Sequence, residues 1–184
     1  MKYCSTCGEQ VALQIPEGDD RERHVCTVCG FIHYSNPRII VGSVPVFQHK
    51  VLLCKRAIEP RLGYWTLPAG FLENGESTLA GATRETLEEA CAVISNGRIY
   101  TVFDLPQINQ VYIFYLAELD NGEFGVGPES LECGLYQESD IPWKELAFPV
   151  IGKTLKHYFS DRSKGSFPVR TEVLTYPRHV FREE

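Results

Sequence analysis

The sequence lacks any run of about 18 apolar residues, the length that a membrane-spanning helix requires, so no membrane partner is expected. Its start, Met1-Lys2-Tyr3-Cys4, lacks the apolar core of a signal peptide, which favours a cytoplasmic protein. A basic excess is also missing, because 24 acidic and 18 basic side chains give a net charge of −6. Proteins that bind nucleic acid through its phosphates are usually basic, so nucleic acid is not an expected partner.

Strong compositional bias is absent as well, which excludes disordered, collagen-like and low-complexity architectures. Hydrophobic residues make up 43% of the 184 residues and charged residues 23%, as in ordinary folded proteins. This length suits one domain of roughly 100–150 residues plus a smaller unit. The seven cysteines are an odd number, so they cannot all pair within the chain. In a reducing compartment, clustered cysteines bind metal more often than they form disulfides.

Four of the cysteines have the spacing C-x2-C-x18-C-x2-C: Cys4, Cys7, Cys26 and Cys29. Two such pairs present the four thiolates that tetrahedral Zn²⁺ prefers, and four protein ligands leave no open coordination position. We therefore predict a structural zinc in residues 1–36, which hold too few large apolar side chains to form a core alone. Two disulfides or free thiols are the alternatives, which a reducing compartment disfavours.

From Pro37 onward the hydrophobic pattern predicts alternating strands and helices. The expected strands are 38–47, 51–56, 99–105, 110–119, 135–136 and 169–174, and the expected helices are 77–92 and 147–159. Their irregular alternation indicates an α/β or α+β fold with a mixed sheet.

The chain is expected to comprise three parts: a zinc ribbon (1–36), a larger domain (37–160) and a C-terminal tail (161–184). The tail is expected to add one strand or to contact a second copy of the chain in a homodimer, because residues 149–184 carry a net charge of +3.

Three glutamates fall within one turn of the helix predicted over 77–92. Glu85, Glu88 and Glu89 stand at positions i, i+3 and i+4, where like charges repel by a few tenths of a kcal/mol. Glu76 adds a fourth carboxylate just before the helix, and Gly70 begins a loop that can fold back on it. Carboxylates that converge at a loop are typical ligands of hard cations, so we predict a Mg²⁺ or Mn²⁺ site. A solvated acidic helix face is the alternative.

The segment resembles the Nudix box of the Nudix hydrolases, G-x5-E-x7-R-E-U-x-E-E-x-G-U. Six specified positions match at the family's spacing over 20 residues: Gly70, Glu76, Arg84, Glu85, Glu88 and Glu89. The departures are Thr86 and Ala92 in place of aliphatic residues and Cys91 in place of glycine. None of the three removes a carboxylate.

The resemblance implies an α/β/α sandwich with a mixed sheet, preceded by the small zinc ribbon. The ribbon and the segment 127–133 resemble the Nudix subgroup that includes plant plastid FAD pyrophosphatases. A ribbon before a Nudix domain also resembles the NADH pyrophosphatases. The S-Q-P-W-P-F-P-x-S motif of those enzymes is absent between Val93 and Leu105, which lowers the expectation of NAD(H) as the substrate.

The activity that the resemblance implies is Mg²⁺-dependent hydrolysis of the pyrophosphate bond in a nucleoside diphosphate derivative, with FAD or ADP-ribose first. The alternatives are an NADH pyrophosphatase and a non-catalytic domain that senses a nucleotide. The resemblance assigns the metal to Glu85, Glu88 and Glu89, with Glu76 in support and a backbone carbonyl from Gly70.

For the general base, Glu129 is the first candidate and Glu132 the second, because a Gly/Pro-bounded loop carries both. Glu88 or Glu89 itself is the alternative. Residues 37–148 carry 8 basic and 15 acidic side chains, a net charge of −7, so a bound divalent cation is needed to attract a pyrophosphate.

Four further residues are candidates for substrate binding. Arg56 is expected to contact the pyrophosphate from a strand end, although a surface arginine is the alternative. Three aromatic residues are candidates for stacking on an adenine or flavin ring, with a place in the core as the alternative: Trp65, Phe71 and Tyr112.

Overall fold

The computed structural model describes residues 1–175, which divide into two compact units. The first unit is Met1–Pro37, and the second begins at Arg38. No helix in residues 1–175 is both long and apolar enough to cross a membrane. The prediction that the tail contacts a second copy falls partly on residues 176–184, which lie outside the described residues.

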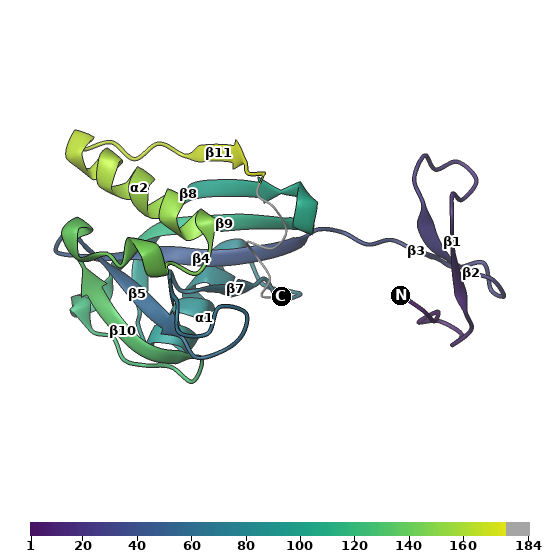
Figure 1. The fold of residues 1–184 in the computed structure, drawn as a ribbon, viewed down its shortest axis with the longest axis horizontal. Coiled ribbons are helices and arrows are strands. Elements are labelled where there is room, and N and C mark those ends of the chain that lie inside the picture. The colour runs from purple at the N-terminus through teal and green to yellow at the C-terminus, as the bar shows by residue number, and fades with distance from the viewer. Residues whose placement is uncertain (176–184) are drawn as a thin grey trace. The chain divides into compact units, whose positions relative to one another are not determined.

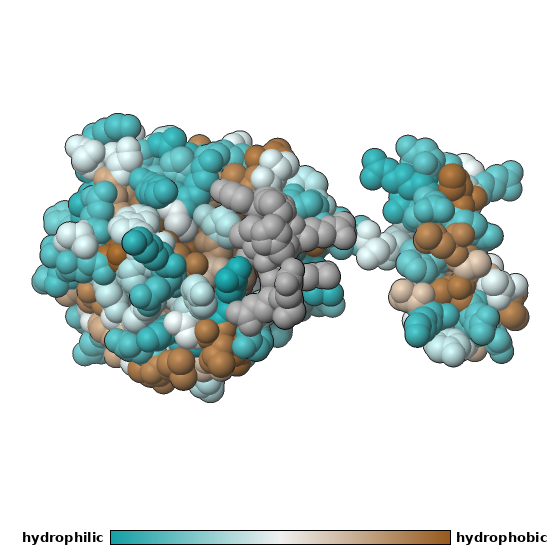
Figure 2. Space-filling model, in the orientation of Figure 1, coloured by the Kyte–Doolittle hydropathy of each residue, from teal (hydrophilic) through white to brown (hydrophobic). Residues whose placement is uncertain are grey.

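The first unit is a three-stranded antiparallel sheet (Figure 1). Its strands are β1 (Val11–Gln14), β2 (Arg23–Cys26) and β3 (Ile32–His33), in that order across the sheet. Large apolar side chains stay exposed on this unit, and hydrophobic residues are visible on its surface in Figure 2. Among them are Tyr3, Leu13, Ile15 and Val28. The unit therefore has no apolar core large enough to hold it together without another stabilising element.

The second unit is built on an eight-stranded mixed sheet with the order β10-β5-β4-β9-β8-β11. Its long path consists of β4 (Arg38–Phe47), β5 (Lys50–Arg56), β8 (Ile94–Leu105), β9 (Gln110–Leu119), β10 (Ser130–Tyr136) and β11 (Arg170–Val173). Two short strands lie off this path: β6 (Trp65–Thr66) pairs with β5, and β7 (Ala69–Phe71) pairs with β4. The pairs β4–β9 and β11–β8 are parallel and the remaining pairs are antiparallel, so the predicted mixed sheet is confirmed.

Two α-helices cover opposite faces of this sheet (Figure 1). Along β4, Ile40 and Val44 point into the main core beneath α2, whereas Val41 packs against Ala82 of α1. The helices are α1 (Thr78–Ala90) and α2 (Pro149–Lys164). Short 3-10 helices connect the elements: η1 (Pro106–Ile108), η2 (Asp120–Gly122), η3 (Glu138–Asp140) and η4 (Trp143–Glu145). This confirms the expected α/β/α sandwich.

Helix α1 begins after the predicted cap Ser77 and ends at Ala90, two residues before its expected end. The Ser77 side chain accepts a hydrogen bond from the Ala80 N–H, which caps the first turn. Cys91 ends the helix in the left-handed conformation with φ 48°, the position at which the Nudix box has glycine. A Cβ on Gly81 would lie 2.8 Å from Cγ2 of Val41, so the glycine allows the helix to lie close against β4.

Three elements are longer than the sequence predicts. Strand β8 begins at Ile94 rather than 99, and β10 begins at Ser130 rather than 135. Helix α2 continues to Lys164, beyond its expected end at Phe159. Most of the extra residues are polar, and pairing or capping within the fold extends each element beyond its main apolar stretch.

Candidate functional site

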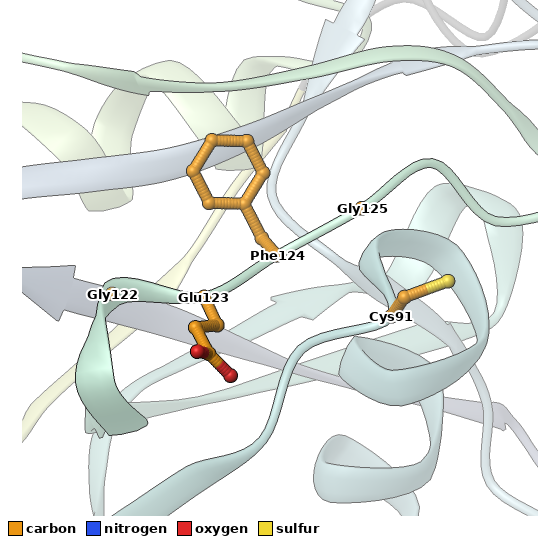
Figure 3. Close-up of a pocket in the computed structure, with 5 residues that line it drawn as sticks. All are labelled: Cys91, Gly122, Glu123, Phe124 and Gly125. Carbon is orange, nitrogen blue, oxygen red and sulfur yellow. The ribbon is translucent and has the colours of Figure 1, made fainter.

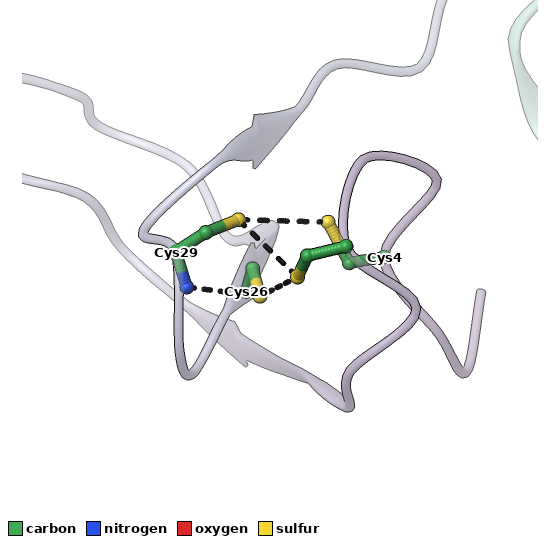
Figure 4. A group of neighbouring side chains, drawn as sticks. Cys4, Cys26 and Cys29 are labelled. Atoms are coloured by element: carbon green, nitrogen blue, oxygen red, sulfur yellow. Dashed lines mark hydrogen bonds between the residues drawn. The ribbon is translucent and has the colours of Figure 1, made fainter.

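The four cysteines of the first unit point their sulfur atoms toward one another, as Figure 4 shows for Cys4, Cys26 and Cys29. Their ligand atoms all lie within 4.8 Å of one another, which is true of no other such group in residues 1–175. The Cys4–Cys29 and Cys7–Cys26 sulfur pairs are 3.8 Å and 3.4 Å apart. A tetrahedron with Zn–S distances of about 2.3 Å has edges of about 3.8 Å, so the quartet fits zinc.

Backbone hydrogen bonds favour the thiolate form of two of these sulfurs, Cys4 and Cys26. The Thr6 N–H donates to the Cys4 sulfur at 3.4 Å, and the Val28 N–H donates to the Cys26 sulfur at 3.4 Å. Nε2 of the buried His33 lies 3.3 Å from the Cys4 sulfur, a contact that the sequence did not indicate. Such contacts orient metal ligands from outside the coordination sphere.

In the second unit, strand β7 holds the backbone of Gly70 against the carboxylate of Glu85, although the sequence predicts a loop from Gly70 onward. A Cβ on Gly70 would lie 2.3 Å from Glu85 Oε2, so any other residue here would displace this carboxylate. The loop then folds back through Glu73, whose N–H donates to Glu76 Oε1 at 2.8 Å. The predicted return of the loop onto the helix is therefore present.

Arg84 is the centre of a network that joins three of the glutamates. Its guanidinium donates to Glu76 Oε1 at 2.7 Å, to Glu85 Oε1 at 2.7 Å and to Glu88 Oε2 at 3.0 Å. It also donates to the Phe71 carbonyl at 3.1 Å, which fixes the loop to the helix. The hydrogen bond from Arg84 lowers the pKa of Glu76.

Glu89 and Glu85 are buried despite their charge. Burial raises the pKa of Glu89 to about 8, although the Ala69 N–H donates to its Oε2 at 3.2 Å. Burial also raises the pKa of Glu85, against the effect of Arg84, and the negative charge of Glu129 adds to the rise in both. A carboxylate buried among other carboxylates is stable in its ionised form only beside a cation.

The side chains of these glutamates offer only oxygen atoms as metal ligands, and oxygen is the ligand type that a hard divalent cation prefers. Glu85 and Glu88 are both turned toward Arg84, whereas Glu89 is turned toward Ala69. In residues 1–175 the glutamate oxygens do not form a group as tight as that of the cysteine sulfurs.

The two candidates for the general base lie in different surroundings. Glu129 is in a turn just before β10, and its carbonyl accepts a hydrogen bond from the Ala57 N–H at 2.9 Å. Its charge acts on both Glu85 and Glu89. Glu132, which the sequence predicts on the same loop, instead lies within β10. This is a correction: the strand begins at Ser130, earlier than its apolar residues indicate.

In β10, Glu132 stands opposite Lys55 of β5. Burial and, after it, the negative charge of Glu132 raise the pKa of Tyr136, whereas the charge of Glu129 is the one that acts on Glu85 and Glu89. Of the two loop carboxylates, Glu129 is therefore the one that acts electrostatically on the box.

The segment that carries Glu129 is fixed to the end of helix α1. The N–H groups of Gly125 and Gly127 donate to the carbonyls of Ala90 and Glu89 at 2.6 Å and 3.0 Å. A Cβ on Gly127 would lie 1.8 Å from the Glu88 carbonyl oxygen, so only glycine fits. These bonds satisfy carbonyls that a helix end leaves unpaired and place Glu129 near the metal candidates.

Of the four candidates for substrate binding, two lie outside the main hydrophobic core and two lie within it. Arg56 donates to the Pro60 carbonyl at 2.9 Å. Burial raises the pKa values of Glu89 and Tyr112, and the positive charge of Arg56 opposes both rises, so Arg56 lies near both. Phe71 is 51% exposed, with the Arg38 guanidinium 5.5 Å from its ring centre.

The remaining two aromatic side chains belong to the core. Trp65 and Tyr112 are 5% and 7% exposed and pack in the main hydrophobic cluster. Trp65 makes an edge-on contact with Tyr136, and the Tyr112 hydroxyl donates to Gln110 at 3.2 Å. Their rings are not presented to a ligand in this structure, which supports the core alternative for both.

A surface pocket of about 480 Å³ lies beside the C-terminal end of α1 (Figure 3). It is lined by Cys91, Gly122, Glu123, Phe124 and Gly125. None of the box glutamates lines it, so this pocket is separate from the candidate metal site.

Two contributors to the site were not indicated by the sequence. One is the Ala69 N–H on Glu89, and the other is Ser43, whose Oγ lies 2.6 Å from Thr86 Oγ1. Thr86 also donates to the Ala82 carbonyl at 2.7 Å. These bonds explain how a threonine is tolerated at a buried position where the box has an aliphatic residue.

Known families match both units. Residues 36–169 match the family described as NUDIX domain, and residues 2–35 match the zinc-ribbon family described as Nudix N-terminal. The NAD-capped RNA hydrolase NudC of Salmonella heidelberg is 30% identical over 144 residues, 77% of this chain and 53% of that protein. NudC of Escherichia coli matches with the same identity and coverage. The chain thus spans about half the length of the curated relatives it matches.

Solved structures resemble the fold. A crystal structure of a NUDIX hydrolase from Nitrosomonas europaea has a TM-score of 0.88 and 50% identity, and the match covers 95% of this chain and 100% of that one. An ADP-ribose pyrophosphatase from Streptococcus suis has a TM-score of 0.61 and 21% identity, with coverage of 74% and 100%. At that identity the second similarity concerns the fold alone.

Proposed function

Since this chain belongs to the Nudix hydrolase family, we propose that it hydrolyses the pyrophosphate bond of a nucleoside diphosphate derivative with the help of a divalent cation. FAD and ADP-ribose are the first substrates to test. The ribbon holds a structural zinc, and the carboxylates of α1 hold Mg²⁺ or Mn²⁺.

The observation that carries this proposal is the burial of Glu89 beside Glu85 and within the field of Glu129. A glutamate that served only solubility would not need to be buried, and burial of the ionised Glu89 carboxylate is unfavourable in free energy. A binding site for a divalent cation explains why three carboxylates share this place.

Each residue has a role in this scheme. Glu85 and Glu89 bind the cation, with Glu88 as the third ligand and Glu76 in support. Arg84 is a positioning residue, because its hydrogen bonds hold three of these carboxylates in place. When bound, the cation neutralises charge on the pyrophosphate and lowers the pKa of an attacking water.

Glu129 is the proposed general base, because its charge acts on the box carboxylates and its turn is bonded to the end of β5. Arg56 is the proposed contact for the pyrophosphate, since it lies near Glu89 and no ion pair of Arg56 occurs in residues 1–175. Phe71 is the proposed stacking surface, because its ring is exposed beside the metal loop.

A second candidate function follows from sequence similarity. The relatives at 30% identity are named NAD-capped RNA hydrolases, so NADH and NAD-capped RNA join the substrates to test. The net charge of −6 disfavours RNA as a partner, but a capped end offers a pyrophosphate as well as a nucleic acid. The absence of the S-Q-P-W-P-F-P-x-S motif keeps NAD derivatives second.

The test is a substrate panel with the full chain: FAD, ADP-ribose, NADH, NAD-capped RNA and a nucleoside triphosphate, each with Mg²⁺, Mn²⁺ or EDTA. Chromatography resolves the products. Cleavage of a diphosphate derivative that requires the divalent cation supports the proposal. Tight nucleotide binding without cleavage favours a nucleotide sensor instead.

The choice of base is tested with matched variants. Glu129→Gln is expected to lower turnover about 100-fold, the order that a general base contributes. Glu132→Gln makes the same chemical change on β10 and is expected to leave turnover near that of the wild type. The reverse result would assign the role to Glu132.

A further inference from the structure

Cys54 and Cys133 form a pair of thiols outside the zinc quartet. They stand directly opposite each other on the antiparallel strands β5 and β10, with their sulfurs 3.5 Å apart. Opposite residues in such a pair have Cα atoms about 4.5 or 5.5 Å apart. Both values fall within the range of about 4.4–6.8 Å that a disulfide spans. The backbone therefore already suits a bond between the two sulfurs.

The surroundings favour reaction at Cys133. Cys54 is only 1% exposed, whereas Cys133 is partly exposed and open to a small molecule. Ser130 is 8% exposed at the start of β10, beside this pair, and its hydroxyl interacts with both sulfurs. The hydroxyl can donate a hydrogen bond to a sulfur that gains charge.

We propose that Cys54 and Cys133 are a dithiol modification site that hydrogen peroxide converts to a disulfide. The Cys133 sulfur attacks one peroxide oxygen, the O–O bond breaks, and a sulfenic acid and one water form. The Cys54 sulfur then attacks the Cys133 sulfur, the S–O bond breaks, and its oxygen leaves as a second water with the proton of Cys54. Two electrons pass from the two thiols to the peroxide, and a thiol reductant reverses the change.

This site is coupled to the helix that carries the metal ligands. The Cys133 thiol donates to the Glu89 carbonyl at 3.5 Å, and both cysteines pack with Ala90 at the end of α1. Disulfide formation shortens the sulfur separation from 3.5 Å to about 2.05 Å and removes that donor. The end of α1 then shifts, and with it the carboxylate of Glu89. This consequence rests on the proposed function, whereas the disulfide itself does not.

The bond is tested by treating the full chain with hydrogen peroxide until exposed Cys91 is oxidised, then alkylating free thiols and digesting with trypsin. Mass spectrometry is expected to find peptide 51–55 joined to the peptide that contains Cys133, and dithiothreitol should release it. Oxidation of Cys91 without this link would show the proposal wrong. The wild-type chain gives the answer even if a variant fails to fold.

Turnover tests the coupling separately. Peroxide is expected to lower metal-dependent turnover by up to about 100-fold, as a misplacement of about 1 Å can do. Dithiothreitol should restore it. Cys133→Ser should keep its turnover after peroxide, and Cys91→Ser should lose turnover as the wild type does. Equal loss in Cys133→Ser would place the damage elsewhere, for example in the zinc ribbon. A chain that forms the link but hydrolyses no substrate before oxidation would contradict the proposed function and leave the dithiol site intact.

Discussion

A Cβ atom on Gly70 would lie 2.3 Å from Oε2 of Glu85, so this carboxylate rests directly against bare backbone. Gly70→Ala is therefore expected to displace Glu85 and to lower metal-dependent turnover by roughly 100-fold. The fold should remain, because Gly70 lies in the short strand β7, off the main path of the sheet. Steady-state turnover and thermal unfolding are the two measurements.

Gly152→Ala is the matched control for this change. Gly152 lies in α2, where an added Cβ would meet its nearest neighbour, Leu146, at 3.5 Å. This variant is expected to gain about 1 kcal/mol of stability and to keep full turnover. Normal turnover in Gly70→Ala would remove Glu85 from the proposed metal site.

Glu89→Gln is expected to abolish most turnover and yet stabilise the protein without divalent cation. Burial raises the pKa of Glu89 to about 8, so between about pH 4.5 and pH 8 the unfolded chain loses this proton before the folded chain does. The free energy of unfolding therefore falls as pH rises through this window, by on the order of a few kcal/mol. Gln carries no charge and escapes the penalty.

Denaturant unfolding at pH 5, 7 and 9, with and without Mg²⁺, measures this effect. Wild-type protein should regain stability with Mg²⁺ at high pH, and Glu89→Gln should not respond. Glu88→Gln is expected to keep the fold and to lose turnover as well. Glu123→Gln, outside the box, is the control for the loss of one charge. A wild type whose stability is flat from pH 5 to 9 would contradict the burial of an ionisable Glu89.

The sequence predicts the type of site, a cluster of carboxylates for a divalent cation, better than it predicts which other residues belong to that site. The spacing of Glu85, Glu88 and Glu89 depends only on helix geometry, which local sequence determines. Glu132 was misplaced because strand β10 begins before its apolar residues, held by pairing with β5. Pairing between distant strands leaves no local pattern, so it was not predictable.

The aromatic candidates illustrate a second limit. An aromatic side chain such as that of Trp65 or Tyr112 can either stack on a ligand or pack in the core. Only tertiary packing distinguishes the two roles. Phe71 stays exposed because its strand β7 is short and lies off the main path of the sheet. The cysteine quartet was predictable in full, since each pair is local and zinc supplies the long-range constraint.

Removal of zinc is expected to unfold the first unit alone. The sulfurs of its four cysteines fit a tetrahedral ion, and the unit exposes most of its large apolar side chains. Cys26→Ser should lose about one zinc per chain and the amide dispersion of β1–β3, since metal binding supplies on the order of 10 kcal/mol of folding free energy in such units. Elemental analysis and amide NMR spectra measure both. Retained dispersion in the metal-free chain would contradict a structural zinc.

Asp161 ties the end of α2 to the sheet. It is 1% exposed, accepts a hydrogen bond from Tyr100 at 2.8 Å and pairs with Arg170 of β11. Burial opposes its charge, but the hydrogen bonds from Arg170 and Tyr100 prevail and lower its pKa below 3.8. A lowered pKa adds stability above the unfolded value, and this stability is lost as pH falls through the folded value.

Asp161→Asn is therefore expected to lose about 3 kcal/mol at pH 7, with a smaller deficit below pH 3.8. Tyr100→Phe removes one donor only and should lose about 1 kcal/mol. Urea unfolding across pH 3–7 measures both variants. A deficit that does not change with pH would mean that packing, rather than charge, holds this contact.

Cys91 stands where the Nudix box has glycine, and its φ of 48° is unfavourable for any residue with a Cβ. Cys91→Gly is expected to raise the free energy of unfolding by about 1 kcal/mol and to leave turnover unchanged, because the side chain is exposed and no box glutamate lines its pocket. Cys91→Ala is the matched control, since alanine removes the thiol but keeps the Cβ. Urea unfolding should therefore show a gain for glycine and none for alanine. An equal gain in both variants would assign the effect to the thiol instead of the backbone.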